Sequence, residues 1–118
     1  MKYLCLVYHE EAMMDALPER EHDAITDDVL AYREELRQNG HYLASSPLQS
    51  VRTATTIRVR NGKLAVTDGP FAETKEQLGG FYLIDARDLN EAIRVASKMP
   101  PARIGCIEVR PLKELTPR

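Results

Sequence analysis

The stretch Thr53-Ala-Thr-Thr-Ile-Arg-Val-Arg-Asn-Gly-Lys-Leu-Ala-Val-Thr67 predicts a β-hairpin near the middle of the chain. Apolar and polar residues alternate on both sides of Asn61-Gly62, which is the spacing of strands with two different faces. Asn-Gly is a preferred pair for the type I′ turn that joins two antiparallel strands. One face of the hairpin would then carry Ile57, Val59, Leu64 and Val66.

Before the hairpin, the sequence reads as strand, helix and strand. Residues 2–8 are apolar at nearly every position, which is typical of a buried central strand. Residues 19–39 repeat apolar side chains at helical spacing between Pro18 and Gly40, which suit the start and the end of a helix. Residues 41–44 indicate a second strand, and residues 9–18 read as an acidic loop.

After the hairpin, the same order returns. Residues 80–85 and 104–110 predict strands, and residues 72–77 suggest a single helical turn. A helix should begin at Asp88, because Asp88 followed by Glu91 is a variant of the capping box. We therefore predict a ferredoxin-like α+β domain, with the order β-α-β, an inserted β-hairpin and β-α-β. Both helices would cover the same face of an antiparallel sheet.

Length and charge limit the possible functions. The chain has 118 residues, and we expect a single domain over residues 1–118. Its 16 Lys and Arg against 18 Asp and Glu give a net charge of −2, which argues against a general binder of nucleic acid or anionic membranes. No apolar run is long enough to span a bilayer, and the first one is too short for a signal peptide. The expected location is the cytoplasm.

The first strand is apolar on both of its faces, which has a consequence for assembly. Tyr3, Cys5 and Val7 oppose Leu4, Leu6 and Tyr8, so if helices cover one of these two faces, the other needs another cover. The commonest solution is a two-fold homodimer that packs sheet on sheet. We therefore expect a homodimer.

The segment Asp-Gly-Pro-Phe-Ala-Glu-Thr-Lys-Glu, residues 68–76, gathers ionisable side chains beside a glycine between two predicted strands. Loops held by rigid strands often carry binding sites. In this interpretation Asp68 orients the loop, Lys75 and Glu76 contact a polar ligand, and Tyr82 lines the cleft. His9 could transfer a proton near neutral pH, so His9 and Asp68 are weak catalytic candidates. The alternative interpretation is a structural turn whose charges face water.

The same nine residues resemble the signature of the DGPF (DGPFAETKE) family, which is part of the YCII-related group. The resemblance covers nearly the whole chain, from Met1-Lys2-Tyr3-Leu4 through Gln77-Leu78-Gly79-Gly80-Phe81-Tyr82 to Ile107-Glu108-Val109-Arg110-Pro111. It implies a ferredoxin-like fold that dimerises into a barrel-like α+β arrangement. It implies no settled activity, but genes of this family often lie beside those of extracytoplasmic-function sigma factors.

One related YCII-type enzyme removes chloride from a chlorinated quinol, and the wider group is associated with a catalytic His–Asp pair. In this chain the histidine position falls near Val29, with His22 two turns earlier, and the aspartate position falls at residues 97–99. Neither position holds the required residue. We therefore do not transfer the pair or the dehydrochlorinase activity to this chain.

Charged residues alternate outward on two predicted strands, with Arg58 and Arg60 on one and Glu108 and Arg110 on the other. Arginine recognises carboxylates through paired hydrogen bonds, so Arg58 is a candidate for binding an anionic ligand. The alternative, which we favour, is an ion-pair network across strands or across the dimer interface.

The sequence predicts no metal and no cofactor. His9, His22 and His41 lack metal-binding spacing, and Cys5 and Cys106 read as buried, reduced thiols in apolar strands. A carboxylate site for a hard cation would need the first loop to meet the 68–76 segment. Such a site would draw on Glu10, Glu11, Asp68, Glu73 and Glu76.

Two functions fit these observations. The first, which we favour, is a small ligand-binding protein or an enzyme with a pocket next to the Asp68–Glu76 loop. The alternative is a regulatory or adaptor module that binds a protein partner such as an extracytoplasmic-function sigma factor. The Met-rich segment from Met13 to Leu17 is its candidate contact, because methionines adapt to varied partners.

Overall fold

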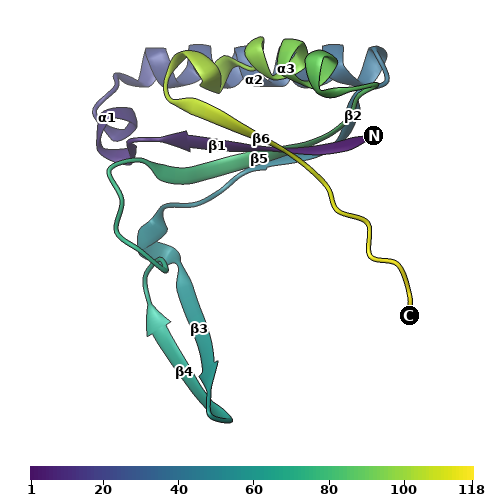
Figure 1. The fold of residues 1–118 in the computed structure, drawn as a ribbon. Helices are drawn as coiled ribbons and strands as arrows, with labels where there is room; N and C mark the ends of the chain where they lie inside the picture. The colour runs from purple at the N-terminus through teal and green to yellow at the C-terminus, as the bar shows by residue number, and fades with distance from the viewer.

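The computed structural model describes residues 1–118 and shows a four-stranded sheet, helices on one face of it, and a separate two-stranded ribbon (Figure 1). The mixed α+β class is confirmed. In chain order the elements are β1 Lys2–His9, α1 Glu11–Asp15, α2 Glu19–Gln38, β2 Tyr42–Pro47, the 3₁₀ turn η1 Val51–Thr53, β3 Thr55–Arg60, β4 Lys63–Asp68, β5 Gln77–Asp85, α3 Leu89–Ser97, the 3₁₀ turn η2 Pro100–Arg103 and β6 Cys106–Pro111.

The sheet has the strand order β2-β5-β1-β6, and every neighbouring pair is antiparallel. β1 lies inside the sheet, as its apolar sequence predicts. Leu4 is opposite Leu83 of β5 on one side and Arg110 of β6 on the other. Since directly opposite residues share a face, this register separates two sets of side chains along the sheet.

One face of the sheet makes the core. Tyr3, Cys5 and Val7 of β1 point to it and are buried, together with Tyr82 and Ile84 of β5. α2 and α3 lie over this face (Figure 1). The helices contribute Leu36, Ala92, Val95 and Ala96, and Met99 follows α3.

The other face of the sheet has no helix over it (Figure 1). It carries Leu4, Leu6 and Tyr8, which are half-buried. Their partners in the register are Phe81 and Leu83 on β5, and Cys106, Glu108 and Arg110 on β6. We call this surface the open face.

The helix boundaries follow the expected signals. α2 begins directly after Pro18 and ends at Gln38, before Gly40 with its φ of +77°. The Asp88 carboxylate accepts a hydrogen bond from the Glu91 backbone N–H at 2.9 Å and so caps α3. None of these helices combines the length and apolar character that crossing a bilayer requires.

The structure corrects several local predictions. Residues 11–15 form the short helix α1 within the predicted acidic loop, because Glu, Ala and Met are good helix formers. The helical turn predicted over residues 72–77 is absent, since β5 already begins at Gln77, where it pairs with His9. β2 starts after His41 and continues through Pro47, and the expected hairpin strand begins at Thr55 after a 3₁₀ turn.

The two cysteines differ. Cys5 is buried, as predicted, but Cys106 is exposed. Cys106 pairs with Tyr8 on the open face, at the start of the edge strand β6. The apolar run around Cys106 predicts a strand correctly but does not reveal that this strand is at an edge.

The predicted hairpin is the two-stranded ribbon β3–β4. Asn61 and Gly62 have φ values of +53° and +73°, which the type I′ turn requires. The ribbon projects away from the helices, on the side of the open face (Figure 1). Its two strands pair only with each other. Its apolar face has no cover in the chain, since Ile57, Val59, Leu64 and Val66 are all exposed.

Candidate functional site

A cleft of about 130 Å³ lies at the end of the sheet where β1 ends and β5 begins. Its roof is the middle of α2, with Ile25, Val29 and Arg33. Its floor is made by the end of β1, the start of β5 and the end of β2. Met14 of α1 and Ile104 also line it, so the cleft is mostly apolar with a few polar groups.

The cleft exists because the apolar stripe of α2 has two different surroundings. Leu36 packs in the core and Tyr32 packs against it, whereas Ile25 and Val29 face the cleft. Below them lie Gly79 and Gly80 of β5 and the end of β2, which line the floor of the cleft. The middle of α2 therefore covers a cleft instead of a packed core.

Arg33 is the unusual group in this cleft. It follows Val29 by one helical turn and lines the same space. Its Nε is buried and has no hydrogen-bond partner. Arg33 also belongs to none of the six ion pairs of the chain. A guanidinium donor without an acceptor is unfavourable in a buried place, so an anionic ligand in the cleft would satisfy it.

Tyr82 lies next to this arginine in the cleft lining. Burial raises the pKa of its hydroxyl, and the charge of Arg33 partly opposes this shift. Tyr82 is therefore a neutral hydroxyl near pH 7. Together, Tyr82 and Arg33 offer a hydrogen-bonding group and a positive charge among apolar walls.

His9 lies at the edge of the same cleft, where β1 ends. Its ring packs directly on Gly79, since a Cβ atom at that position would be only 2.1 Å from His9 Cε1. Glycine at position 79 is thus needed for the imidazole to sit here. A histidine at the edge of a cleft can accept or donate a proton near neutral pH.

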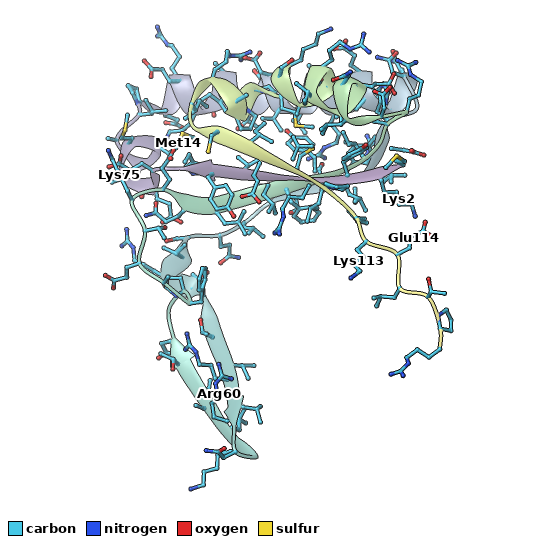
Figure 2. The ribbon with its side chains drawn as sticks, in the orientation of Figure 1. Lys2, Met14, Arg60, Lys75, Lys113 and Glu114 are labelled. Atoms are coloured by element: carbon cyan, nitrogen blue, oxygen red, sulfur yellow. The ribbon has the colours of Figure 1, made fainter.

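Lys75 and Glu76 line a second hollow with Glu10, Met13 and Ile104. Ile104 lines both spaces, so the end of the 68–76 segment adjoins the main cleft. Figure 2 shows Lys75 and Met14 at this same end of the sheet. Of the residues expected at the site, the structure thus brings His9, Tyr82, Lys75 and Glu76 to one region.

Asp68 and Arg58 lie elsewhere. Both are exposed residues of the ribbon, which points away from the cleft (Figure 1). Arg58 and Arg60 lie on β3, whereas Arg110 Nε is 3.4 Å from Glu108 Oε2 on β6. The four charged residues therefore do not meet within one chain.

The 68–76 segment is held by hydrogen bonds that reach α1. The Gln77 side-chain oxygen accepts from the Glu11 backbone N–H at 2.9 Å, and its nitrogen donates to Thr74 O at 2.6 Å. The Glu11 carboxylate accepts from the Ser50 hydroxyl and the Val51 backbone N–H, both at 2.9 Å. These contacts fix the loop, α1 and η1 around the cleft end of the sheet.

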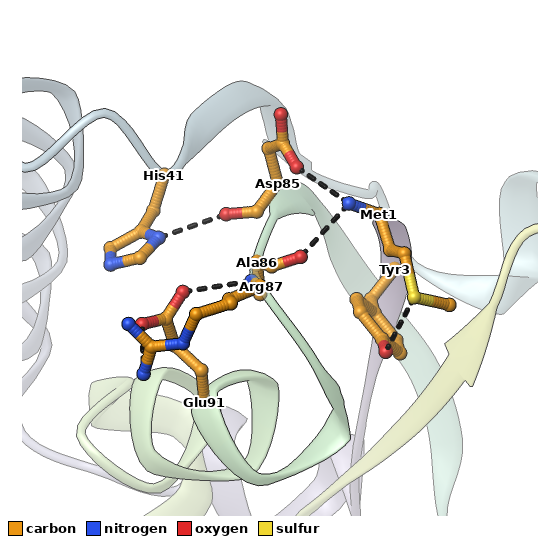
Figure 3. Close-up of polar contacts among 7 residues, drawn as sticks. All are labelled: Met1, Tyr3, His41, Asp85, Ala86, Arg87 and Glu91. Carbon is orange, nitrogen blue, oxygen red and sulfur yellow. Dashed lines mark hydrogen bonds and ion pairs between the residues drawn. The ribbon is translucent and has the colours of Figure 1, made fainter.

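The opposite end of the sheet is closed by polar contacts (Figure 3). The Met1 ammonium is 3.0 Å from Asp85 Oδ1 and donates to Ala86 O at 2.9 Å. His41 Nδ1 is 2.8 Å from Asp85 O, and the Arg87 backbone N–H donates to the Glu91 carboxylate at 2.9 Å. Because these groups satisfy one another's hydrogen bonds, we interpret this end of the sheet as structural and not as a binding site.

The carboxylates considered for a cation site do not gather. Nowhere in the chain do three histidine, cysteine, aspartate or glutamate side chains lie close enough to hold a metal. The Glu11 carboxylate is occupied by Ser50 and Val51.

The sequence pattern does contain a signal for Arg33, which lies eight residues after Ile25 and four after Val29 on the same helix face. A charged residue that continues an apolar stripe is unusual on a core-facing helix. The sequence does not show that a cleft lies below this stripe, because that depends on how α2 lies across the sheet.

Comparisons with known proteins agree with this architecture. Residues 1–116 match the YCII-related domain. A protein of Rhizobium meliloti (strain 1021), described as uncharacterized, is 39% identical over 114 residues, which are 95% of this chain and 92% of that protein.

Among solved structures, the chain resembles 5-chloro-2-hydroxyhydroquinone dehydrochlorinase from Burkholderia phenoliruptrix AC1100 in complex with 2,5-dihydroxybenzoquinone. The TM-score is 0.52 at 17% identity, over 96% of this chain and 94% of the other. At this identity, the likeness shows a shared fold.

Proposed function

The chain belongs to the YCII-related family, and on this premise we propose that it binds a small acidic molecule with a flat apolar body. The site would be the cleft beneath the middle of α2, and the chain would act as a binding protein or as an enzyme. The observation that carries the proposal is the buried Nε of Arg33, which has no partner among apolar walls.

Each group in the cleft has a role in this proposal. The Arg33 guanidinium would hold a carboxylate, phenolate or enolate oxygen, while Ile25 and Val29 would contact the apolar body. The neutral Tyr82 hydroxyl would hydrogen-bond a second oxygen. His9 would exchange a proton with the ligand if the chain is an enzyme.

The structural neighbour suggests a probe for this site. Its bound molecule, 2,5-dihydroxybenzoquinone, is a flat ring with acidic hydroxyl groups, which is the chemistry that Arg33 and the apolar walls would accept. The identity to that enzyme is too low to transfer its reaction. The molecule is therefore a ligand to test, together with benzoate as a simpler acid.

The test is isothermal titration calorimetry with 2,5-dihydroxybenzoquinone and benzoate, using 1,4-dimethoxybenzene as a neutral ring of similar size. We expect at least one acid to bind, and Arg33→Met to weaken it by roughly tenfold or more, since a hydrogen bond to a charged group contributes about 1.5–3 kcal/mol. The neutral ring should bind poorly to both proteins.

Arg20→Met is the matched control. Arg20 lies on the exposed surface of the same helix, so its removal changes the net charge equally without changing the cleft. Equal weakening by both substitutions, or no binding of either acid to the unsubstituted chain, would contradict the proposal. Lys75→Ala then tests whether the 68–76 loop contributes a second contact, as its place beside the cleft suggests.

We also propose the narrower assignment to the DGPF family, with its ferredoxin-like fold, and a homodimer formed through the open face. The nine residues from Asp68 to Glu76 support the first, and the half-buried Leu4, Leu6 and Tyr8 on a face without helices support the second. The sigma-factor partner and the cytoplasmic location stay predictions from the sequence. No contact in the structure favours the sigma-factor partner over a small ligand.

A further inference from the structure

We propose that the β3–β4 ribbon is an arm that packs its apolar face against a second copy of this chain. This inference rests on the proposed dimer through the open face and adds a second contact to it. It also gives a role to a part of the molecule that the ligand cleft does not use.

The apolar face of the ribbon is the first observation. Ile57 is opposite Val66 and Val59 is opposite Leu64, so all four side chains share one face. Each is between 58% and 66% exposed. An isolated two-stranded ribbon is only marginally stable in water, so a ribbon with this face needs a packing partner.

The shape of the chain is the second observation. Its radius of gyration is 16.5 Å, whereas a compact chain of this length has about 13–14 Å. The excess reflects the ribbon and the C-terminal tail, which both extend away from the sheet (Figure 1). Both segments extend on the side of the open face, which no helix of the same chain covers (Figure 1).

The direction of the ribbon selects the partner. It projects on the side of the open face, so any molecule that covers that face must lie beside the ribbon (Figure 1). A facing sheet would pack about 10 Å away, and its helix layer would add about another 10 Å. The six-residue strands of the ribbon span about 20 Å, so the ribbon would reach both layers of a second copy.

Charge complementarity favours a second copy as well. The other face of the ribbon, near its tip, carries Arg58, Arg60 and Lys63, and Figure 2 shows Arg60 near the far end of the ribbon. The α2 helix, in the layer that the tip would reach, has seven acidic residues against three arginines. A nucleic acid could also attract the basic tip, but it would leave the apolar face uncovered.

The test is sedimentation velocity of the full chain over a range of concentrations. We expect a dimer, and we expect Leu64→Gln/Val66→Gln to raise its dissociation constant roughly 30-fold or more, because two amides would enter an apolar contact without partners. Ala65→Gln/Thr67→Gln is the matched control, because it places the same two amides on the opposite face of the same strand and keeps the charges of Arg58, Arg60 and Lys63. It should change the constant less than about threefold.

The outcomes distinguish the proposed arm from the proposed dimer through the open face. A dimer that both double variants leave unchanged overturns the arm and keeps the dimer through the open face. A monomer at micromolar concentration overturns both, as does a monomer that binds duplex DNA through the basic tip. Circular dichroism on every variant tests whether the core remains folded. We expect it to remain folded, because the ribbon strands pair with no other strand. Ligand binding in the cleft is measured separately and does not depend on these results.

Discussion

Strand β1 and the β3–β4 ribbon alternate their side chains in the same way, yet their surroundings differ. Tyr3, Cys5 and Val7 of β1 lie beneath two helices and are buried, whereas Ile57 and Val59 of β3 face open space. Alternation fixes which side chains share a face, but it does not say what covers that face. Stability should therefore concentrate in the sheet and helices, while the ribbon depends on contacts from outside the chain.

The strongest test of this comparison is the loss of one isoleucine from each region. Ile84 is fully buried in the core, so Ile84→Ala should lower the free energy of unfolding by about 3 kcal/mol. Ile57 is 65% exposed, so Ile57→Ala should change it by less than about 0.5 kcal/mol in the Leu64→Gln/Val66→Gln background, at a protein concentration where that variant is monomeric. Urea unfolding measures both, and equal losses would show that the ribbon is part of the core.

A smaller effect is expected at the helix layer of the core. The Tyr32 hydroxyl donates to Val95 O at 2.7 Å, so Tyr32→Phe should destabilise the chain by about 1 kcal/mol near pH 7. Burial, with help from the charge of Glu35, raises the pKa of Tyr32 to about 12 from its ordinary 10. Tyr8→Phe on the open face is the control.

The pH dependence of that substitution has a definite sign. An unfolded chain releases the Tyr32 proton near pH 10, while the native chain holds it until about pH 12. The contribution of this group is thus fully present below pH 10 and is lost as the pH rises through 12. Above pH 10, the midpoint temperature of thermal unfolding should fall less steeply with pH in Tyr32→Phe than in the unsubstituted chain. An unchanged slope would contradict this assignment.

The smallest expected effect concerns the reactivity of the two cysteines and not the stability of the fold. Burial raises the pKa of the Cys5 thiol to about 11, whereas Cys106 is exposed on the open face. A thiol reagent should therefore modify one cysteine per monomeric native chain and two after unfolding. In the dimer, labelling of Cys106 should slow down, and fast labelling of Cys106 in a dimer would mean that the open face is not the interface.

Local signals predicted much of the fold. Asp88 with Glu91, the pair Asn61-Gly62 and the limits of α2 all rest on contacts within a few residues, which the sequence displays directly. Helix α1 was missed because five residues are too few to show a helical period. The exposure of Cys106 was missed because it depends on β6 being an edge strand, which is a long-range property.

The candidate site was harder to predict. His9 and Tyr82 lie in the cleft, and Lys75 and Glu76 lie beside it, but Asp68 and Arg58 lie on the ribbon. A cluster of ionisable residues in one loop indicates which chemical groups are available. It does not indicate which of these side chains lie close together in the fold. The role of Arg33 could not be predicted, because the cleft that it lines depends on how α2 packs over the ends of β1 and β5.

The position of Tyr82 has a practical consequence for optical work. The chain has five tyrosines and no tryptophan, so its ultraviolet emission comes from tyrosine alone. One of these five emitters lies in the wall of the cleft. An aromatic acid bound there would quench part of that emission, so the molecule carries its own reporter for the site, without a dye or an added label.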